Sequence, residues 1–244
     1  MDNKQTAIII PARYGSSRLE GKPLLEACGK PIIQWVWEKA KQTPLVDRVI
    51  IATDDERIFN ACKKFGAEVE MTSTEHKSGS DRIAEVARKH PEIGYIINLQ
   101  GDEPLIEQAN IELVIKGVKF DEKADISTLV REIKDEDEVN NPNLVKCVFD
   151  FNNYAMYFSR SKIPFERNIG KSKFYGHLGI YGYKAEALFK MTELSQTPYE
   201  MAESLEQLRA LQNGMKIKVA IVENIPVGID TQEDFERFKK MVEG

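Results

Sequence analysis

Short apolar runs alternate with amphipathic stretches of helical period along the first half of the chain, which predicts strands alternating with helices. Such alternation is typical of an α/β fold with a mostly parallel sheet covered by helices. Polar or small residues follow the strands, and open α/β sheets bind ligands beyond the carboxyl ends of their strands, so we expect these loops to share one crevice. The expected strands are Ala7–Ile10, Arg48–Thr53, Glu68–Met71 and Tyr95–Leu99, and the helices are Pro31–Lys41, Glu56–Phe65 and Ser80–Lys89.

The pattern is looser after Ile106, where a helix, a strand and an acidic stretch precede two strand-like runs. These runs are joined by Phe151-Asn152-Asn153, which predicts a hairpin. No linker or repeat divides the chain, so we expect a single domain over residues 1–244. The elements expected here are helix Asn110–Phe120, strands Ile126–Val130, Leu144–Asp150, Tyr154–Ser159 and Leu178–Tyr183, helix Tyr199–Asn213 closed by Gly214, strand Lys216–Val222 and helix Thr231–Val242.

The composition narrows the classes of protein and partner. With 244 residues, 42% of them hydrophobic, the chain is long enough to bury the core of one large α/β domain. A net charge of −5 argues against nucleic-acid or anionic-membrane partners, so a basic loop on this acidic protein points to a small anionic ligand. No apolar run approaches the roughly 20 residues of a membrane span, and no secretory signal is evident, so we expect a cytoplasmic protein. The three cysteines show no metal or disulfide spacing, which favours reduced, structural roles.

The first expected strand leads into a loop rich in small and basic residues, Pro11-Ala12-Arg13-Tyr14-Gly15-Ser16-Ser17-Arg18-Leu19-Glu20-Gly21-Lys22. We expect the chain to leave the sheet at Pro11, because proline cannot donate to a strand ladder. The glycines let backbone N–H groups approach an anion, and Arg13, Arg18 and Lys22 add positive charge, which favours a nucleoside triphosphate site. The spacing matches neither a Walker A loop nor Gly-x-Gly-x-x-Gly, and an ordinary solvated basic loop is the alternative.

Carboxylates follow two other strand-like segments. Asp102 lies in Gln100-Gly101-Asp102-Glu103-Pro104, and near a triphosphate it is expected to bind Mg²⁺, which prefers one or two carboxylates together with phosphate oxygens. The alternative is that Asp102 and Glu103 cap the following helix. Asp230 is either a second carboxylate on the same ion or the cap of the last helix, and spacing leaves both open.

Several other polar residues have both a functional and a structural interpretation. Ser78-Gly79-Ser80 and Arg82 could hold a base or phosphate, or form a helix cap with a surface arginine. Arg160 could bind a substrate carboxylate through two parallel N–H groups, or it could be a solvated residue at the end of a strand. His177 could donate a hydrogen bond to a hydroxyl-rich ligand, or it could have a structural role. The helical pattern places Glu206 and Gln207 on the solvent-exposed face of a helix.

Seven segments together resemble the 3-deoxy-manno-octulosonate (Kdo) cytidylyltransferases, also called CMP-Kdo synthetases, in family order over essentially the full length. The segments are IIPARYGSSRLEGKPL, HKSGSDR, NLQGDEP, YAMYFSRSKIPF, HLGIYGY, LEQLR and GIDTQEDFER. The resemblance implies an α/β domain of the nucleotide-diphospho-sugar transferase type, Rossmann-like with three layers. It also implies a homodimer that converts CTP and Kdo into CMP-Kdo and pyrophosphate with Mg²⁺, for lipopolysaccharide inner-core synthesis.

The resemblance also implies roles for residues at the matching positions. The central catalytic groups would be Arg13, Lys22, Asp102 and Asp230, of which Asp102 and Asp230 would hold Mg²⁺. The nucleotide would lie among Ala12, Arg13, Arg18, Lys22, Ser78, Gly79, Arg82 and Gln100. The sugar acid would contact Gln100, Arg160, His177, Tyr181, Glu206 and Gln207, with Arg160 on its carboxylate. The region from about 125 to 183 would contribute the sugar-acid pocket and the dimer contact.

The chain departs from the family pattern at Gly176, where relatives often carry Arg or Lys before the matched histidine. A second cation for the substrate would then come from Lys171 or Lys173. The alternative is a cytidylyltransferase for 8-amino-Kdo or for a sialic acid, because such enzymes share the same strands, loop and metal chemistry. A sugar-nucleotide binding protein without catalytic activity is the alternative from another functional class. The presence of Asp102 and Asp230, the expected metal ligands, argues against it.

Overall fold

The computed structural model describes residues 4–15, 19–223 and 228–243. The chain forms two compact units, one comprising Met1–Glu112 with Pro226–Gly244 and the other Leu113–Ile225. No helix among the described residues is both long and apolar enough to cross a membrane. The two units are described separately below.

The first unit is built on four parallel strands in the order β6-β1-β4-β5. In β1, Ile9 pairs with Ile50 of β4 on one side and with Asn98 of β6 on the other. The isoleucines of β1 and β4 are fully buried, as expected for parallel strands covered on both faces. The strands are β1 (Gln5–Ala12), β4 (Arg48–Thr53), β5 (Glu68–Met71) and β6 (Ile93–Asn98).

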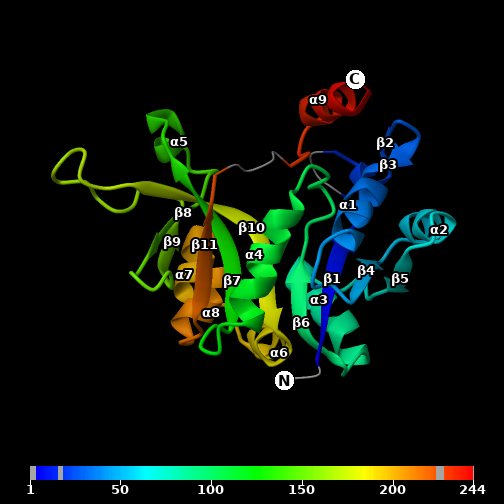
Figure 1. Cartoon of the computed structure of the whole chain (residues 1–244), viewed down its shortest axis with the longest axis horizontal. Helices are drawn as coiled ribbons and strands as arrows, with labels where there is room; N and C mark the ends of the chain where they lie inside the picture. The colour runs from blue at the N-terminus through cyan, green and yellow to red at the C-terminus, as the bar shows by residue number, and fades with distance from the viewer. Residues whose placement is uncertain (1–3, 16–18, 224–227, 244) are drawn as a thin grey trace. The chain divides into compact units, whose positions relative to one another are not determined.

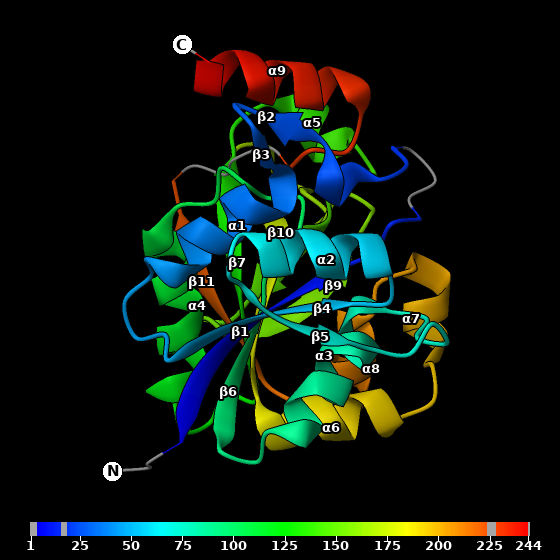
Figure 2. The ribbon, with the colours of Figure 1, turned by 90° about the vertical axis from the view of Figure 1, so that its right-hand side faces the viewer.

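Helices follow these strands in the chain, as the sequence predicts. They are the 3₁₀ turn η1 (Lys22–Leu24), α1 (Ile32–Lys41), α2 (Glu56–Lys64), α3 (Gly79–Lys89) and α9 (Gln232–Glu243), with a small hairpin of β2 (Glu26–Ala27) and β3 (Lys30–Pro31). The helix α9, red in Figure 2, lies over this hairpin. Its Phe238 ring contacts the Trp35 ring of α1, with the ring centroids 5.7 Å apart. This packing holds α9 against α1 in the first unit.

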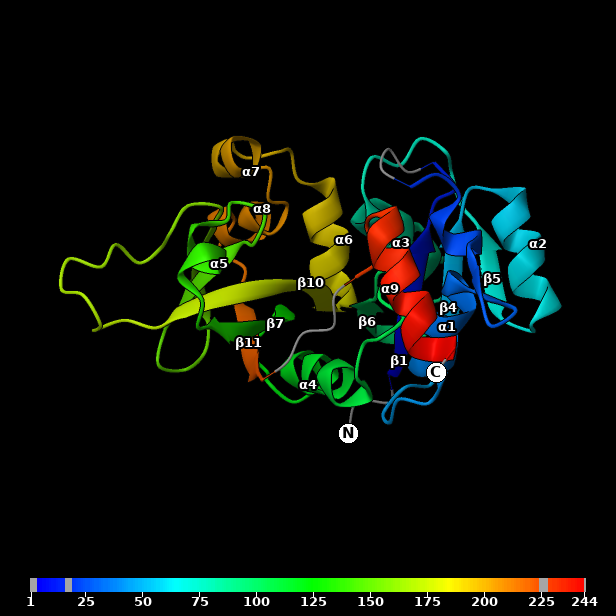
Figure 3. The same cartoon turned by 90° about the horizontal axis from the view of Figure 1, so that it is seen from above.

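The second unit holds a mixed sheet in which β10 runs antiparallel to β7, and β11 runs parallel to β7. A hairpin of β8 and β9 extends this sheet along β10 (Figure 1). The segment between β9 and β10 projects from the rest of the unit as a long loop (Figure 3). The elements are β7 (Ile126–Ile133), α5 (Glu136–Asn140), β8 (Lys146–Phe149), β9 (Ala155–Ser159), β10 (Phe174–Lys184), α6 (Ala185–Glu193), α7 (Pro198–Glu203), α8 (Gln207–Gln212) and β11 (Ile217–Val222), and α4 (Gln108–Lys119) leads into it.

The predicted strands and the hairpin are confirmed, with shifts of a few residues at their ends. The expectation that the chain leaves the sheet at Pro11 is wrong, because β1 continues to Ala12 and Pro11 pairs with Ala52. Proline lacks only its own backbone N–H donor, so the sheet loses at most one hydrogen bond there. Near the end of a strand this loss costs little stability. The sequence pattern did not predict α6.

The predicted helix Tyr199–Asn213 is also wrong, since the structure has two short helices there, α7 and α8. The break falls at Ser204, whose φ of 52° lies in the left-handed region. The Glu203 carboxylate accepts hydrogen bonds from the Ser159 hydroxyl (2.6 Å) and from the Arg160 N–H (2.9 Å). These contacts hold the carboxyl end of α7 against β9. A single continuous helix could not keep them, so the chain breaks at Ser204.

Candidate active site

A cavity of about 410 Å³ lies at the carboxyl ends of β1 and β6 in the first unit. Its lining combines small residues with the basic side chains Arg13, Lys22 and Lys77 and with two carboxylates. The predicted crevice is therefore present for the loops after β1 and β6, whereas the loop after β4 does not line it. The composition of the crevice is that of an anion site. The lining residues are Pro11, Ala12, Arg13, Gly15, Lys22, Pro23, Lys77, Gly79, Gln100, Gly101, Asp102 and Asp230.

Two carboxylates distant in sequence converge on one ammonium in this cavity. Lys22 Nζ lies 2.6 Å from Asp102 Oδ2 and 3.3 Å from Asp230 Oδ1. Asp102 follows β6 and Asp230 precedes α9, so the fold brings together the two residues predicted to share a metal ion. Oxygen donors of this kind suit a hard cation such as Mg²⁺.

The backbone explains why these carboxylates meet. The Ile229 N–H donates to the Asp102 carbonyl at 2.8 Å, which ties the chain before α9 to the loop after β6. The cap of α9 is Thr231, because its hydroxyl accepts from the Asp234 N–H and the Asp234 carboxylate accepts from the Thr231 N–H. Asp230 is therefore not needed as the cap and turns toward Lys22.

A third carboxyl group, Glu103, lies beside this pair. Burial, together with the negative charges of Asp102 and Asp230, raises the pKa of Glu103 to about 8. The pKa of Glu103 therefore lies near neutral pH, well above that of an ordinary carboxyl group.

The loop before α3 forms another wall of the cavity. Arg13 donates a hydrogen bond to the His76 carbonyl, which fixes this loop against the end of β1. Ser78 caps α3 through a capping box with Asp81, so the structural interpretation of Ser78 holds. Gly79, the first residue of α3, lines the cavity, and the backbone N–H groups of such a helix start favour a phosphate.

Arg82 does not line this cavity, so its predicted contact with the nucleotide stays a prediction. Its side chain is fully buried, with Nη2 2.5 Å from Asp54 Oδ2 and Nη1 2.5 Å from the Thr72 hydroxyl. Because Arg82 follows the helix cap on the inner face of α3, it ties α3 to the loop after β4. Arg18, predicted to contact the triphosphate, lies outside the described residues.

In the second unit, Arg160 is held by backbone carbonyls rather than solvated. Its Nε donates to the Glu203 carbonyl at 2.7 Å and its Nη1 to the Pro142 carbonyl at 3.1 Å. The fully buried Lys146 ammonium supports the same residue, because it donates to the Arg160 carbonyl at 2.6 Å. Burial lowers the pKa of Lys146. Arg160 is thus a positioned guanidinium at the end of β9.

His177 packs with its ring against the rings of Phe158 and Tyr181. The Thr128 hydroxyl lies 2.7 Å from the Ile180 carbonyl and 2.9 Å from His177 Nε2. A carbonyl only accepts, so the hydroxyl proton goes to it and Nε2 must donate to Thr128. Neutral His177 then offers Nδ1 as an acceptor, and its role toward a hydroxyl-rich ligand stays a prediction.

The remaining predicted sugar-acid residues belong to both units. Glu206 is close enough to Tyr181 for its charge to raise the pKa of that phenol, although burial is the larger cause. Gln207 is buried at the start of α8. Gln100 belongs to the other unit, where its side-chain amide donates to the Asn98 amide oxygen at 3.3 Å.

Burial of His177 predicts a pH-dependent stability. Burial lowers the pKa of His177 from 6.5 to about 3, so between these values the unfolded chain binds more protons than the folded one. Stability should therefore fall as the pH drops through this window, with a slope of at most about 1.4 kcal/mol per pH unit from this group. Urea unfolding between pH 7 and pH 4 should show a smaller slope for His177→Gln, and equal slopes for both proteins would contradict the prediction.

Gly176 has a packing reason to lack a side chain. A Cβ there would lie 3.0 Å from a methyl carbon of Leu144. Of the two lysines expected to replace the missing cation, Lys173 pairs with Glu132 at 2.7 Å, and Lys171 is exposed. Their role toward a substrate stays a prediction.

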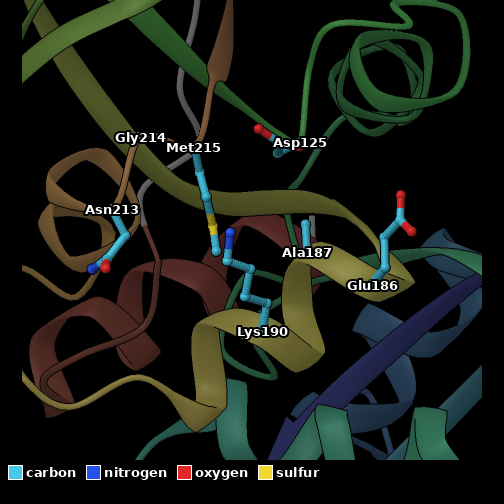
Figure 4. A pocket seen from close by; sticks show the side chains of 7 residues that line it. All are labelled: Asp125, Glu186, Ala187, Lys190, Asn213, Gly214 and Met215. Carbon is cyan, nitrogen blue, oxygen red and sulfur yellow. The ribbon is translucent and has the colours of Figure 1, made fainter.

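A further cavity of about 290 Å³ in the second unit lies between α6 and the start of β11 (Figure 4). Its lining includes the exposed side chains of Glu186 and Lys190, with Met215 at its wall. Among the described residues, no predicted sugar-acid contact lines it. It is therefore separate from the predicted sugar-acid site.

The fold and the first cavity define the class of this protein as a nucleotidyltransferase. The cytidylyltransferase family matches residues 7–217. The chain belongs to the 3-deoxy-manno-octulosonate cytidylyltransferases. It is 49% identical to one from Thermodesulfovibrio yellowstonii (96% of this chain and 97% of the relative) and 48% identical to one from Fusobacterium nucleatum (94% and 93%).

A solved structure of a CMP:2-keto-3-deoxy-manno-octonic acid synthetase complexed with CTP is similar to this chain with a TM-score of 0.95. The two sequences are 42% identical, and the match covers 98% of this chain and 99% of the other. The predicted α/β fold class with a mostly parallel sheet is confirmed by this likeness. The assignment of residues 1–244 to one domain stays a prediction, as do the roles of the individual site residues.

Proposed function

We propose that this enzyme transfers the cytidylyl group of CTP to Kdo, giving CMP-Kdo and pyrophosphate, and thereby supplies activated Kdo for lipopolysaccharide synthesis. The observation that carries the proposal is the first-unit cavity, where Asp102, Asp230 and Lys22 meet beside the start of α3. Family membership supports the choice of CTP and Kdo over 8-amino-Kdo or a sialic acid.

Residues of the cavity would bind and orient the nucleotide. Arg13, Lys22 and Lys77 supply positive charge, and the N–H groups at Gly79 supply donors for phosphate oxygens. In-line attack by the anomeric hydroxyl of the sugar on the α-phosphorus needs the two reactants held together and the leaving pyrophosphate neutralised. The basic side chains of this cavity would meet the second need, and no covalent intermediate on the protein is required.

Asp102 and Asp230 would hold Mg²⁺, and their arrangement around the Lys22 ammonium fits a site built for a cation. When bound, the ion supplies further positive charge for the phosphates.

In the second unit, Arg160 would orient the carboxylate of the sugar acid. Three of its five N–H groups bond to carbonyls of Pro142, Glu203 and Ser204, which leaves two donors on a fixed guanidinium. His177 would accept a hydrogen bond from a sugar hydroxyl at Nδ1. Tyr181, Glu206 and Gln207 of the same unit would complete the polar lining, and a contact of the sugar acid with Gln100 stays a prediction.

We also propose that the protein is a homodimer that contacts its copy through the second unit. Support comes from large apolar side chains that are exposed in this unit, namely Phe151, Met156, Phe165 and Ile169. A cytoplasmic location is part of the same proposal.

The test is pyrophosphate release with CTP and Mg²⁺ in parallel reactions containing Kdo, 8-amino-Kdo or N-acetylneuraminate. We expect the highest kcat/KM with Kdo, and a large loss when UTP replaces CTP. A preference for another acid would keep the mechanism and change the substrate. No release with any of the three acids would overturn the proposed activity.

A further inference from the structure

The ammonium of Lys22 lies where the two carboxylates of the proposed metal site converge. Its side chain is 12% exposed, whereas the Asp102 and Asp230 side chains are 30% and 47% exposed, so the ammonium is the most buried of the three charges. The geometry is that of a cation and its ligands, with Lys22 as the cation.

The local backbone holds Lys22 in this place. Lys22 is the first residue of η1, which begins after Gly21 in the left-handed conformation (φ 65°) and carries Pro23 as its second residue. The Leu24 N–H donates to the Gly21 carbonyl at 2.8 Å, and the Gly21 N–H donates to the Tyr14 carbonyl at 2.9 Å. The start of the side chain is therefore fixed, and only the flexible methylene stem can carry the ammonium elsewhere.

We infer that Lys22 is a built-in competitor of the divalent cation: its ammonium occupies the place between Asp102 and Asp230 and offsets one of their two negative charges until a nucleotide arrives, and so it weakens binding of the bare ion. This inference rests on the proposed function, which assigns the metal to these carboxylates. Mg²⁺ binds carboxylate oxygens at about 2.1 Å. An ammonium 2.6 Å from Asp102 Oδ2 would then lie close to the ion, and two cations at that separation repel strongly in a partly buried site.

A bound triphosphate resolves this conflict, because its oxygens offer the ammonium new acceptors in the same cavity. Lys22 can then leave the carboxylates as the cation enters with the nucleotide. The expected consequence is that the metal–nucleotide complex binds well and the free metal binds weakly. Removal of the ammonium should therefore have opposite effects on these two ligands, which a merely structural role of Lys22 would not produce.

The experiment measures binding of Mn²⁺ alone, followed by the paramagnetic resonance of the free ion, to the full-length protein without nucleotide. Lys22→Met should bind Mn²⁺ at least about tenfold more tightly than the wild type, because one of the two negative charges is no longer neutralised. Lys22→Gln provides a second neutral side chain should the first variant fold poorly. Lys22→Arg keeps the charge and should resemble the wild type. The same neutral variants should bind CTP in the presence of Mn²⁺ more weakly.

The double variant Lys22→Met/Asp102→Asn identifies the site being measured. Loss of the tightened binding in this variant supports the inference. Equal Mn²⁺ affinity in the wild type and in both neutral variants, with binding still sensitive to Asp102→Asn, would overturn the competition and leave the metal site standing. Mn²⁺ binding that ignores Asp102→Asn, with and without CTP, would instead overturn the metal assignment in the proposed function and the inference with it.

Discussion

Replacing Asp102 with Asn should lower kcat for pyrophosphate release by about 10³-fold at saturating CTP and sugar acid. The substitution keeps the shape of the side chain and removes the charge that lies 2.6 Å from Lys22. It leaves Asp230 as the remaining charged partner of that ammonium and as the remaining carboxylate ligand for the proposed Mg²⁺. The substitution therefore disturbs the position of the Lys22 ammonium and also weakens the binding of the cation that would neutralise the phosphates.

The matched control is Asp137→Asn, which removes an exposed carboxylate on α5 in the other unit and should leave kcat unchanged. Steady-state rates at several Mg²⁺ concentrations separate two causes of a loss. A defect that high Mg²⁺ restores indicates weakened metal binding, whereas a defect that persists indicates loss of transition-state stabilisation. A loss of less than tenfold at every Mg²⁺ concentration would show that Asp102 has no central role in the reaction.

The sequence predicts well those features that a local pattern determines. The strand β4 was predicted with the bounds that the structure gives, because its apolar run ends abruptly at Asp54. The position of Asp102 at the cavity follows from the same logic, since residues after parallel strands meet at one sheet edge. Such features need only periodicity and a general rule about open sheets.

Features decided by contacts between distant residues could not be predicted from the sequence pattern. Whether Asp230 caps α9 or faces the cavity depends on Thr231 taking the cap and on the bond from Ile229 to Asp102. The burial of Arg82 depends on Asp54, a residue of another loop. In both cases the sequence named the residue and left two interpretations open, and the structure supplied the physical reason for its place.

The direction of the His177 hydrogen bond is a third example. An isolated histidine in a sequence gives no sign of which ring nitrogen is already engaged. Only the approach of Thr128 to the Ile180 carbonyl fixes the hydroxyl proton and hence the role of His177 Nε2. The register of β7 against β10, which places Thr128 opposite Tyr181, is set by the whole sheet rather than by the residues next to His177.

The second large effect is expected at a buried ion pair that joins α7 to α8. Arg209→Met should lower the free energy of unfolding by about 3–5 kcal/mol, because it leaves the Glu200 carboxylate buried without its cation. Arg209 Nε lies 2.9 Å from Glu200 Oε2, and Nη2 lies 2.5 Å from Oε1. Urea unfolding followed by circular dichroism measures the change.

The double variant Arg209→Met/Glu200→Leu tests the electrostatic reason for this loss. Removing both charges ends the desolvation penalty, so the double variant should recover most of the lost stability, whereas simple loss of packing would make the two substitutions additive. The same pair bears on function, because α8 begins at Gln207 and the contacts of Glu203 hold the end of α7 to β9 and Arg160. If α7 and α8 separate in Arg209→Met, the KM for the sugar acid should rise while the KM for CTP stays nearly constant. An equal rise in the KM for the sugar acid and in the KM for CTP would show that the ion pair affects the whole protein rather than the proposed sugar-acid site.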